Sequence, residues 1–369
     1  MPFADELIGD HTAKSLIEAV AAVAPGAPLA ALRTAAGELA TRSLRERSDL
    51  LRDALLRDLP GDYDAFARTI RAAKTGELPF SGWLIWPVTG AIAAKAVDGG
   101  GVDAFDDAMA VLAELTSRLT SEFAIRVLLD HDVDRALAAV LTWVASPDEH
   151  VRRLASEGTR PFLPWAKRVP ALLARPRATL PVINALYRDE SEYVRRSVAN
   201  HLNDLSRQQP DLVVETAAAW LSEPDEHTAR LVRNGLRTLV KKGHPGALGL
   251  LGFAHVDGID VVGPTLAETR VPFGGTAGFT ATITNTAAEP ATLAIDYIVH
   301  HMKANGDQRG KTFKLTTMTL APGERRELSR KHSFREITTR RYYPGAHAIE
   351  LQINGVASGR GEFTLVAAD

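Results

Sequence analysis

Charged side chains recur at helical spacing in several segments of the sequence, and their types can bind anions or carry out acid–base chemistry. Counting four and then three residues from Arg153 reaches Glu157 and Arg160, which therefore share one face of a helix. Arginines bind phosphate, and a carboxylate between them can act as a general base or stabilise a developing positive charge. The alternative is a set of i,i+4 salt bridges on a solvated face, such as Arg153 with Glu157.

The same spacing returns in two later segments. From Arg196, steps of four and then three or four residues reach Asn200 and then Asn203 or Asp204, and from Arg230 a step of four reaches Asn234. Because the pattern repeats in register over three predicted helices, one common polar surface is favoured over isolated salt bridges. We therefore expect one concave surface to be lined by Arg153, Glu157, Arg196, Asn200, Asp204 and Arg230.

The sequence around these residues also repeats. Glu149–Arg153 and Glu192–Arg196 share the pattern Glu-x-Val-Arg-Arg at an offset of 43 residues, and a degenerate copy in Asp225–Leu236 places Arg230 at the same position. A fainter upstream copy places Arg126 there. Units of roughly 35–45 residues with two helices each are typical of HEAT-like solenoids.

The hydrophobic period changes along the chain and indicates two domains. Up to about residue 256, apolar residues recur at three- and four-residue spacings, as in residues 137–144. After Gly258 the period is two, as in residues 276–285 and 291–299. We expect a multidomain α-then-β chain: an α-α superhelix of HEAT-like repeats in residues 1–257, followed by an antiparallel β-sandwich in residues 258–369.

Composition excludes several classes of protein. The chain of 369 residues has no cysteine, which excludes disulfides and thiolate chemistry. Its start, MPFADELIGD, is not a signal peptide, and the most apolar stretch, Gly82–Val97, is broken by Pro87 and Lys95. The sequence therefore predicts a soluble, cytoplasmic protein that does not enter the membrane.

Metal-dependent and serine-hydrolase chemistry find little support. The pair His300-His301 has no third ligand at a suitable spacing, and there is no HExxH or GxSxG motif. We expect neither a metal nor another cofactor.

The charge is unevenly distributed. The formal net charge is −2, yet His300–Tyr343 holds 11 Lys and Arg against 4 Asp and Glu. This basic segment either attracts phosphate or forms a solvated edge of the sandwich.

A longer stretch is specific enough to resemble a known family. Glu149–Leu172, and above all its VRRLASEGTRP-x-LPW run, resembles the AlkC branch of the AlkC/AlkD superfamily of DNA alkylation-repair glycosylases. Thr75–Ala93 and the SEYVRRSVANHLND segment are similar to further parts of that family. The resemblance implies HEAT-like repeats followed by an immunoglobulin-like domain, which agrees with the change of period.

The resemblance also implies an activity and a partner. It implies a monofunctional DNA N-glycosylase that excises cationic bases such as N3-methyladenine and N3-methylcytosine from double-stranded DNA, in base excision repair, without turning the base out into a closed pocket. Because such a base leaves as a neutral molecule, no general acid is needed. A monomer is expected.

Site residues follow from the resemblance as well. Asp204 is the first choice for orienting water or stabilising the sugar cation, Glu157 the second and Glu122 the third. Trp165 would lie against the lesion or its deoxyribose. The substrate-binding set, with its phosphate contacts, is completed by Arg153, Arg160, Arg196, Asn200 and Arg230.

A second class of function remains open. A HEAT-like scaffold or DNA-binding module without catalytic activity would have the same fold, because fold alone does not confer chemistry. Such a scaffold has no need of Glu157, Asp204 and Trp165 on one surface, and an assay for release of methylated base separates the two classes.

Overall fold

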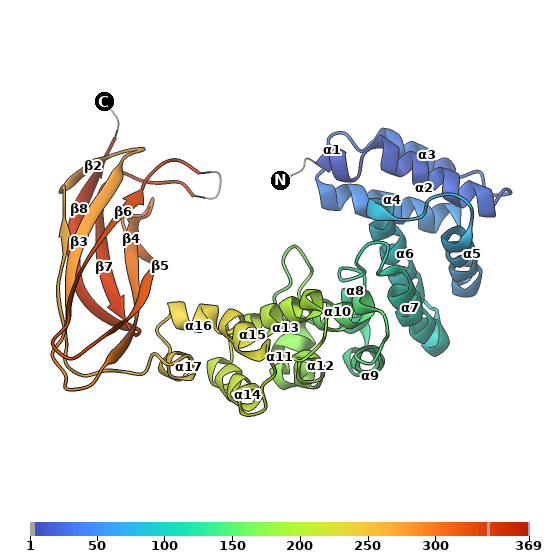
Figure 1. Ribbon diagram of the computed structural model, residues 1–369. Coiled ribbons are helices and arrows are strands. Elements are labelled where there is room, and N and C mark those ends of the chain that lie inside the picture. The colour runs from blue at the N-terminus through green and yellow to red at the C-terminus, as the bar shows by residue number, and fades with distance from the viewer. Residues whose placement is uncertain (1–3, 338–339, 368–369) are drawn as a thin grey trace. The chain divides into compact units, whose positions relative to one another are not determined.

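Helices precede strands along the whole chain (Figure 1). The computed structural model describes residues 4–337 and 340–367. Three short stretches lie outside the described residues: 1–3 at the start of the first predicted domain, 338–339 in the basic segment, and 368–369 at the end of the second predicted domain. The helices are α1 Ala4–Leu7, α2 Asp10–Val23, α3 Ala30–Gly37, α4 Leu44–Asp58, α5 Tyr63–Thr75, η1 Gly82–Leu84, α6 Ile85–Val97, α7 Gly101–Leu115, α8 Ile125–His131, α9 Val133–Trp143, α10 Glu149–Gly158, α11 Pro170–Ala174, η2 Pro176–Thr179, α12 Leu180–Leu186, α13 Glu192–Leu205, α14 Pro210–Ser222, α15 Thr228–Gly235, α16 Arg237–Lys241 and α17 Pro245–Leu250. The strands are β1 Ile259–Leu266, β2 Arg270–Pro272, β3 Thr276–Asn285, β4 Ala291–Met302, β5 Gln308–Leu320, β6 Arg325–Ser333, β7 Gly345–Ile353 and β8 Val356–Val366.

Polar caps fix where the repeated helices begin. The Asp148 side chain accepts a hydrogen bond from the His150 amide at the start of α10. Asp225 accepts from the Thr228 amide at the start of α15. These bonds satisfy amides that have no partner inside the helix. The acid-bearing segment before each repeated Arg thus defines the helix start.

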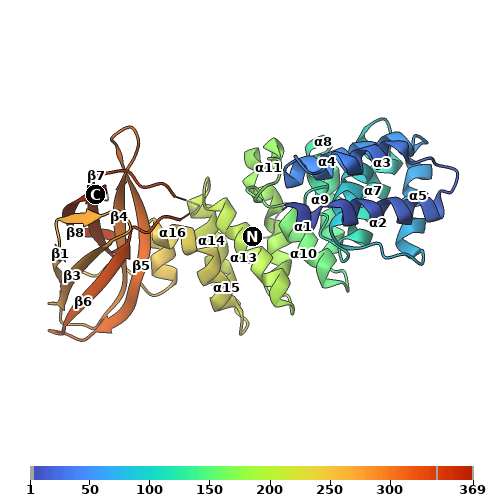
Figure 2. The ribbon, with the colours of Figure 1, turned by 90° about the horizontal axis from the view of Figure 1, so that it is seen from above.

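One apolar side of each repeated helix is buried. In α10 it includes Val151, Leu154 and Ala155, and in α13 it includes Val198 and Leu202. α10 packs against α13, and the two helices lie side by side in both views (Figures 1 and 2). This packing places their polar stripes next to each other.

The chain divides into two compact units. One contains residues up to Gln209 together with Glu223–Leu231, and the other contains Pro210–Ser222 and the chain from Val232 onward. In the second unit α17 packs against α14, and the Asn354 side chain donates to the Ala254 carbonyl at 2.8 Å. The helix-to-strand change falls between Leu250 and Ile259, while a domain boundary at residue 257 stays a proposal.

The strands form the predicted sandwich of two sheets. One sheet has the order β1-β3-β6 and the other β2-β8-β7-β4-β5. The pairings are antiparallel except that β2 runs parallel to β8. The hairpin between β7 and β8 turns at Asn354 and Gly355, whose φ angles are 44° and 82°, as a two-residue hairpin turn requires.

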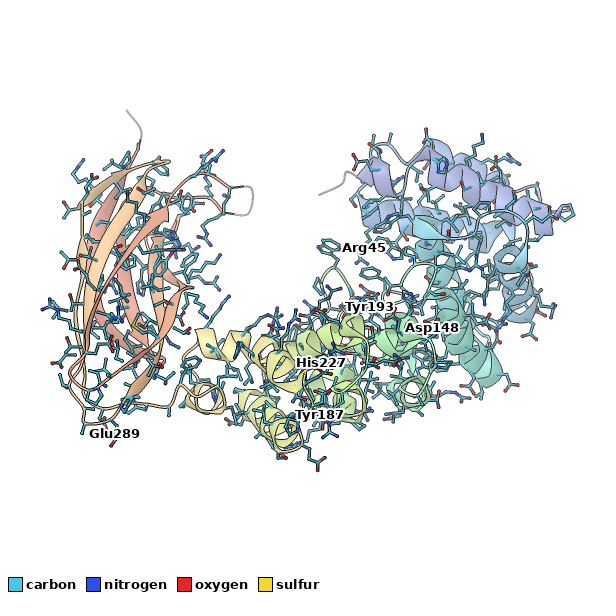
Figure 3. The ribbon with its side chains drawn as sticks, in the orientation of Figure 1. Arg45, Asp148, Tyr187, Tyr193, His227 and Glu289 are labelled. Carbon is cyan, nitrogen blue, oxygen red and sulfur yellow. The ribbon has the colours of Figure 1, made fainter. Side chains whose placement is uncertain are left out.

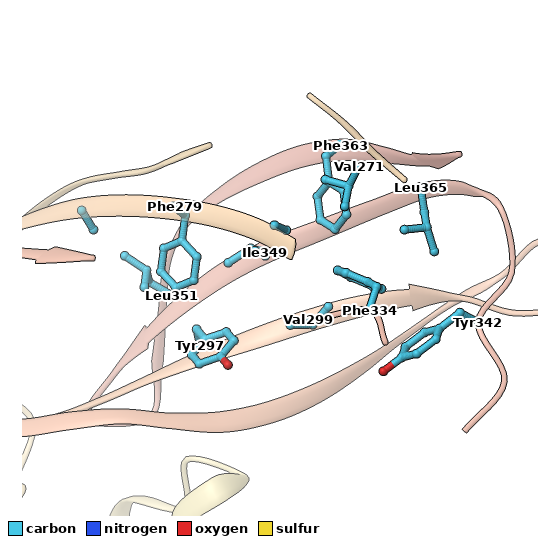
Figure 4. Packing of buried hydrophobic residues seen from close by; sticks show 12 residues of the cluster. Val271, Phe279, Tyr297, Val299, Phe334, Tyr342, Ile349, Leu351, Phe363 and Leu365 are labelled. Carbon is cyan, nitrogen blue, oxygen red and sulfur yellow. The ribbon is translucent and has the colours of Figure 1, made fainter. Parts of the chain in front are cut away.

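Inward-facing residues of the two sheets form the sandwich core. Phe279 of β3 and Tyr297 of β4 are 2 % and 4 % exposed, at the positions that the period of two predicted. Their rings lie 5.3 Å apart. Figure 4 shows them with Phe334, Ile349 and Phe363 in one cluster. The predicted order of helical repeats and then a β-sandwich is confirmed.

Three histidines are buried in this aromatic core. His301, His332 and His347 are at most 7 % exposed, and each ring contacts Phe334. One ring nitrogen of each has no hydrogen-bond partner: Nδ1 of His301, Nε2 of His332 and Nδ1 of His347. Burial, together with the positive charge of nearby Arg340, lowers the pKa of His301 to about 3 and of His332 to about 4.

These histidines should make the sandwich sensitive to acid. Their pKa is lower in the folded than in the unfolded chain, so the unfolded chain binds more protons below about pH 6.5. Stability should be complete above that pH and fall as the pH is lowered towards 4. After correction for the pH dependence of the intrinsic exchange rate, the protection of the β4 and β7 amides should therefore fall over this range.

In a His301→Gln/His332→Gln variant, the stability of the sandwich should depend less steeply on pH. The control His131→Gln, at an exposed helical position, should show the wild-type dependence. Parallel pH profiles for the double variant and the wild type would contradict this account.

Candidate functional site

Arg160 joins the two predicted carboxylates of the repeated helices. Its Nη1 donates to Glu157 Oε1 at 2.6 Å, and its Nε donates to Asp204 Oδ2 at 2.9 Å. Glu157 is on α10 and Asp204 is on α13. One guanidinium therefore holds carboxylates that are far apart in the sequence on the same surface.

A second arginine extends this arrangement to the third predicted carboxylate. Arg153 Nη2 lies 3.4 Å from Glu157 Oε1, and Nη1 donates to Glu122. The same Nη1 donates to the Thr120 hydroxyl at 2.9 Å. We call the sequence Glu122, Arg153, Glu157, Arg160 and Asp204 the carboxylate row. Three acids and two arginines leave it with one net negative charge.

The carboxylate row is buried, and its central acid, Glu157, is stabilised as a carboxylate. Asp204 is 3 % exposed and Glu157 6 % exposed. Burial by itself would raise the pKa of Glu157, but Arg153, Arg160 and a hydrogen bond from Ser197 outweigh it and hold this pKa below its ordinary value. The i,i+4 pair expected for a solvated face is present, but it is buried and belongs to a larger network.

His201 supports the row from inside the protein. It is fully buried on α13, where Nδ1 donates to the Ser156 carbonyl at 2.9 Å and Nε2 accepts from the Thr179 hydroxyl at 3.0 Å. Burial lowers the pKa of His201 to about 4. The neutral ring therefore links α10, η2 and α13 without adding charge beneath the carboxylates.

Trp165 lies on the segment between α10 and α11, which projects from the layer of helices (Figure 1). Its side chain is 71 % exposed, and its φ angle of 59° is in the left-handed region. The ring is therefore available to a ligand rather than part of a core.

Arg126 links the start of this segment to its end through hydrogen bonds to backbone carbonyls. It is 1 % exposed, and its Nη1 donates to the carbonyls of Gly158 and Arg160 at 3.0 and 2.7 Å, while Nε donates to the Lys167 carbonyl at 3.1 Å. Gly158 allows the approach, because a Cβ there would lie 2.8 Å from Ile125. The repeat pattern pointed to Arg126, but its carbonyl partners could not be found in the sequence.

The remaining predicted residues lie outside the ion-pair network. Arg196 is exposed and its Cζ lies 6.0 Å from the Tyr193 ring, which Arg153 also faces at 5.2 Å. In Figure 3, Tyr193 projects from the helical layer. Asn200 is half-buried, and Arg230 pairs with the exposed Glu192 at 3.0 Å. The roles of all these residues stay predictions.

Within the described residues, no group of three or more His, Cys, Asp or Glu is arranged to hold a metal ion. None of the described helices is long and apolar enough to cross a membrane.

Comparisons with known proteins agree on one family. Residues 114–237 match the DNA alkylation repair enzymes, and residues 260–367 match the C-terminal Ig-like domain of the uncharacterised protein YhaZ. YhaZ of Bacillus subtilis is 34 % identical over 313 residues, which are 85 % of each chain. The chain belongs to the DNA alkylation repair enzyme family.

A solved structure of this family resembles the whole chain. It is the alkylpurine DNA glycosylase AlkC of Pseudomonas fluorescens, bound to DNA containing an abasic site analog. It is 31 % identical, covers 99 % of this chain and 100 % of its own, and has a TM-score of 0.84. The family match in residues 114–237 contains the complete carboxylate row and Trp165.

Removing the central guanidinium should destabilise the protein strongly. Arg160→Met leaves Glu157 and Asp204 buried without their common partner, and breaking a buried ion pair costs roughly 3–5 kcal/mol. The free energy of unfolding in urea measures this loss.

Arg230→Met is the matched control, because Arg230 and Glu192 are 75 % and 63 % exposed, and such pairs contribute about 0–1 kcal/mol. Equal losses for the two variants would show that Arg160 is not the central contact of the row.

Proposed function

We propose that this chain is a monofunctional DNA N-glycosylase that hydrolyses the bond between deoxyribose and a cationic alkylated base, such as N3-methyladenine or N3-methylcytosine, in base excision repair. The observation that carries the proposal is the carboxylate row beside the exposed Trp165. Similarity to an AlkC glycosylase over the whole chain supports it. The partner would be double-stranded DNA with alkylated bases, bound by a cytoplasmic monomer that needs no cofactor.

The chemistry requires little from the protein at the leaving group. The bond between C1′ and the base nitrogen breaks, and its electron pair neutralises the positively charged base. The deoxyribose becomes an oxocarbenium-like cation, which water attacks at C1′. Ionised carboxylates would stabilise that cation, and one of them would accept the proton of the attacking water.

The hydrogen bonds within the row favour Asp204 as the group that accepts this proton. Both oxygens of Glu157 have partners: Oε1 binds the two arginines and Oε2 accepts from Ser197 at 2.7 Å. Asp204 is held through Oδ2, and its Oδ1 has no hydrogen bond among the described residues. We therefore keep Asp204 as the first choice, Glu157 as the second and Glu122 as the third, with the latter two acting mainly through their charge.

We further propose that the lesion is engaged without being turned out into a closed pocket. Glu157 and Asp204 lie on the polar side of α10 and α13, and Trp165 lies on a projecting segment. The indole would contact the cationic base or its sugar from the helix surface. Arg196, Asn200 and Arg230 would take part in DNA binding on the same helices.

A non-catalytic scaffold is the second candidate, because every carboxylate of the row has an arginine partner and the row could be purely structural. Release of methylated base from alkylated duplex DNA by the purified protein separates the two candidates. A glycosylase releases the base and leaves an abasic site, whereas a scaffold releases none.

Neutralising Asp204 should abolish most of the activity. Asp204→Asn keeps the shape of the side chain but removes its charge, and we expect single-turnover excision to fall by at least about 100-fold, the size of general-base and electrostatic effects. DNA affinity should change little.

Glu192→Gln is the matched control, since Glu192 is an exposed acid on the same helix, and it should keep the wild-type rate. A wild-type rate in Asp204→Asn at saturating enzyme would assign the role to another group.

Removing the exposed indole should lower excision without unfolding the protein. Trp165→Ala loses a cation–π contact with the base, which contributes about 1–2 kcal/mol. We therefore expect the excision rate to fall roughly tenfold. Its melting temperature should stay near the wild-type value.

Trp143→Ala should, by contrast, lower the melting temperature. Trp143 is only 8 % exposed, and truncating such a buried side chain costs roughly 3–5 kcal/mol of folding free energy. Unchanged excision in Trp165→Ala would remove Trp165 from the proposed site.

A further inference from the structure

Two arginines share one aromatic ring next to the carboxylate row. The Cζ atoms of Arg168 and Arg207 lie 5.0 and 4.7 Å from the centroid of Phe162. Arg168 and Phe162 belong to the segment between α10 and α11, whereas Arg207 follows α13. Residues from two parts of the helical unit thus bring two positive charges to one place.

Neither charge is neutralised by the protein. Arg168 and Arg207 are exposed, and neither forms an ion pair with a carboxylate among the described residues. By contrast, many arginines of the helices have such a partner; among them are Arg135, Arg152, Arg153, Arg160, Arg175, Arg188 and Arg230. Two like charges held near each other repel, and an anion between or beside them relieves this repulsion.

The contacts also hold the two side chains in place. A guanidinium over an aromatic ring gains about 0.5–1 kcal/mol at an exposed site, and Arg168 Nη1 additionally donates to the Leu163 carbonyl at 3.1 Å. Long side chains lose rotamer entropy on binding. Arginines that are already ordered lose less of it when they bind a ligand.

The pair lies directly beside the proposed reacting groups. Phe162 follows Arg160 by two residues, and the Arg207 amide donates to the Asp204 carbonyl at 3.2 Å. The carboxylate row has a net negative charge, which repels a polyanion. Unneutralised arginines at its border would offset that repulsion.

We propose that Arg168 and Arg207, held on Phe162, form a binding site for a phosphodiester of the DNA strand that carries the lesion. The inference rests on the proposed function for its choice of DNA as the ligand. Each guanidinium can donate paired hydrogen bonds to the non-bridging oxygens of a phosphate. The site would position the lesion sugar over the carboxylate row by anchoring its backbone.

The test compares full-length Arg168→Gln/Arg207→Gln with the wild type in binding to a duplex oligonucleotide with a central abasic-site analogue. Each lost phosphate contact flattens the plot of log K against log salt by about 0.9, so we expect the slope to flatten by about 1.8 and the affinity to fall. Excision measured at saturating enzyme should also fall, because without the backbone anchor the lesion sugar is less well positioned over the intact carboxylate row.

Two further variants separate a specific site from general charge. Arg33→Gln/Arg68→Gln removes two exposed arginines of α3 and α5 and should leave the slope unchanged. Phe162→Leu keeps both charges but removes their support, so affinity should fall while the slope stays near the wild-type value.

Three outcomes decide the proposal. An unchanged slope in Arg168→Gln/Arg207→Gln, or an equal change in the control pair, would overturn it. Saturable binding of inorganic phosphate alone that is lost in the double variant would assign the site to a small anion instead of DNA. A protein that excises no base yet shows the expected slopes would refute the proposed function and leave the phosphate site standing.

Discussion

The Arg160 guanidinium is the interaction on which the helical site depends. Burying Glu157 and Asp204 as carboxylates is costly unless each has a partner of opposite charge and good geometry. Arg160 is the positively charged partner of both, with its nitrogens 2.6 Å from Glu157 Oε1 and 2.9 Å from Asp204 Oδ2. These two bonds also join α10 to α13. The helices are therefore held in a register that keeps the acids together and ionised. A site for a cationic transition state needs that charge to be in place before the substrate arrives.

The arginines of this region have different tasks that depend on burial. Arg126 is buried and bonds backbone carbonyls, so it shapes the segment that carries Trp165. Arg160 is buried and Arg153 half-buried, and both bond carboxylates. Arg168 and Arg207 are exposed and lie on an aromatic ring. The buried guanidiniums spend most of their donors within the protein, although Nη2 of Arg126 has no hydrogen-bond partner, whereas the exposed ones keep most of theirs for a ligand.

The β-sandwich is stabilised by different means. Its strands alternate inward and outward residues, and an aromatic cluster around Phe334 fills the space between the sheets. Two of the buried histidines in this cluster, His301 and His332, stay neutral because burial disfavours their charged forms and Arg340 adds positive charge. Buried histidines are thus kept uncharged in both regions, since His201 is neutral as well, whereas the buried acids of the carboxylate row are paired with arginines.

The sequence by itself determined the helical and strand halves, the repeat and the family, because hydrophobic periods and local motifs are written in neighbouring residues. It also predicted Glu157 and Arg160 on one face of a helix, but α10 ends at Gly158 and Arg160 lies just beyond it. Only the tertiary structure decided what each repeated arginine does. The four arginines at equivalent repeat positions have different partners. Arg126 bonds backbone carbonyls, and Arg153 bonds buried acids. Arg196 lies against an aromatic ring, and Arg230 bonds a surface acid. Except for Arg196, whose ring partner Tyr193 lies on the same helix, these arginines have partners from other segments, up to 41 residues away, and no local pattern encodes which of them are buried together.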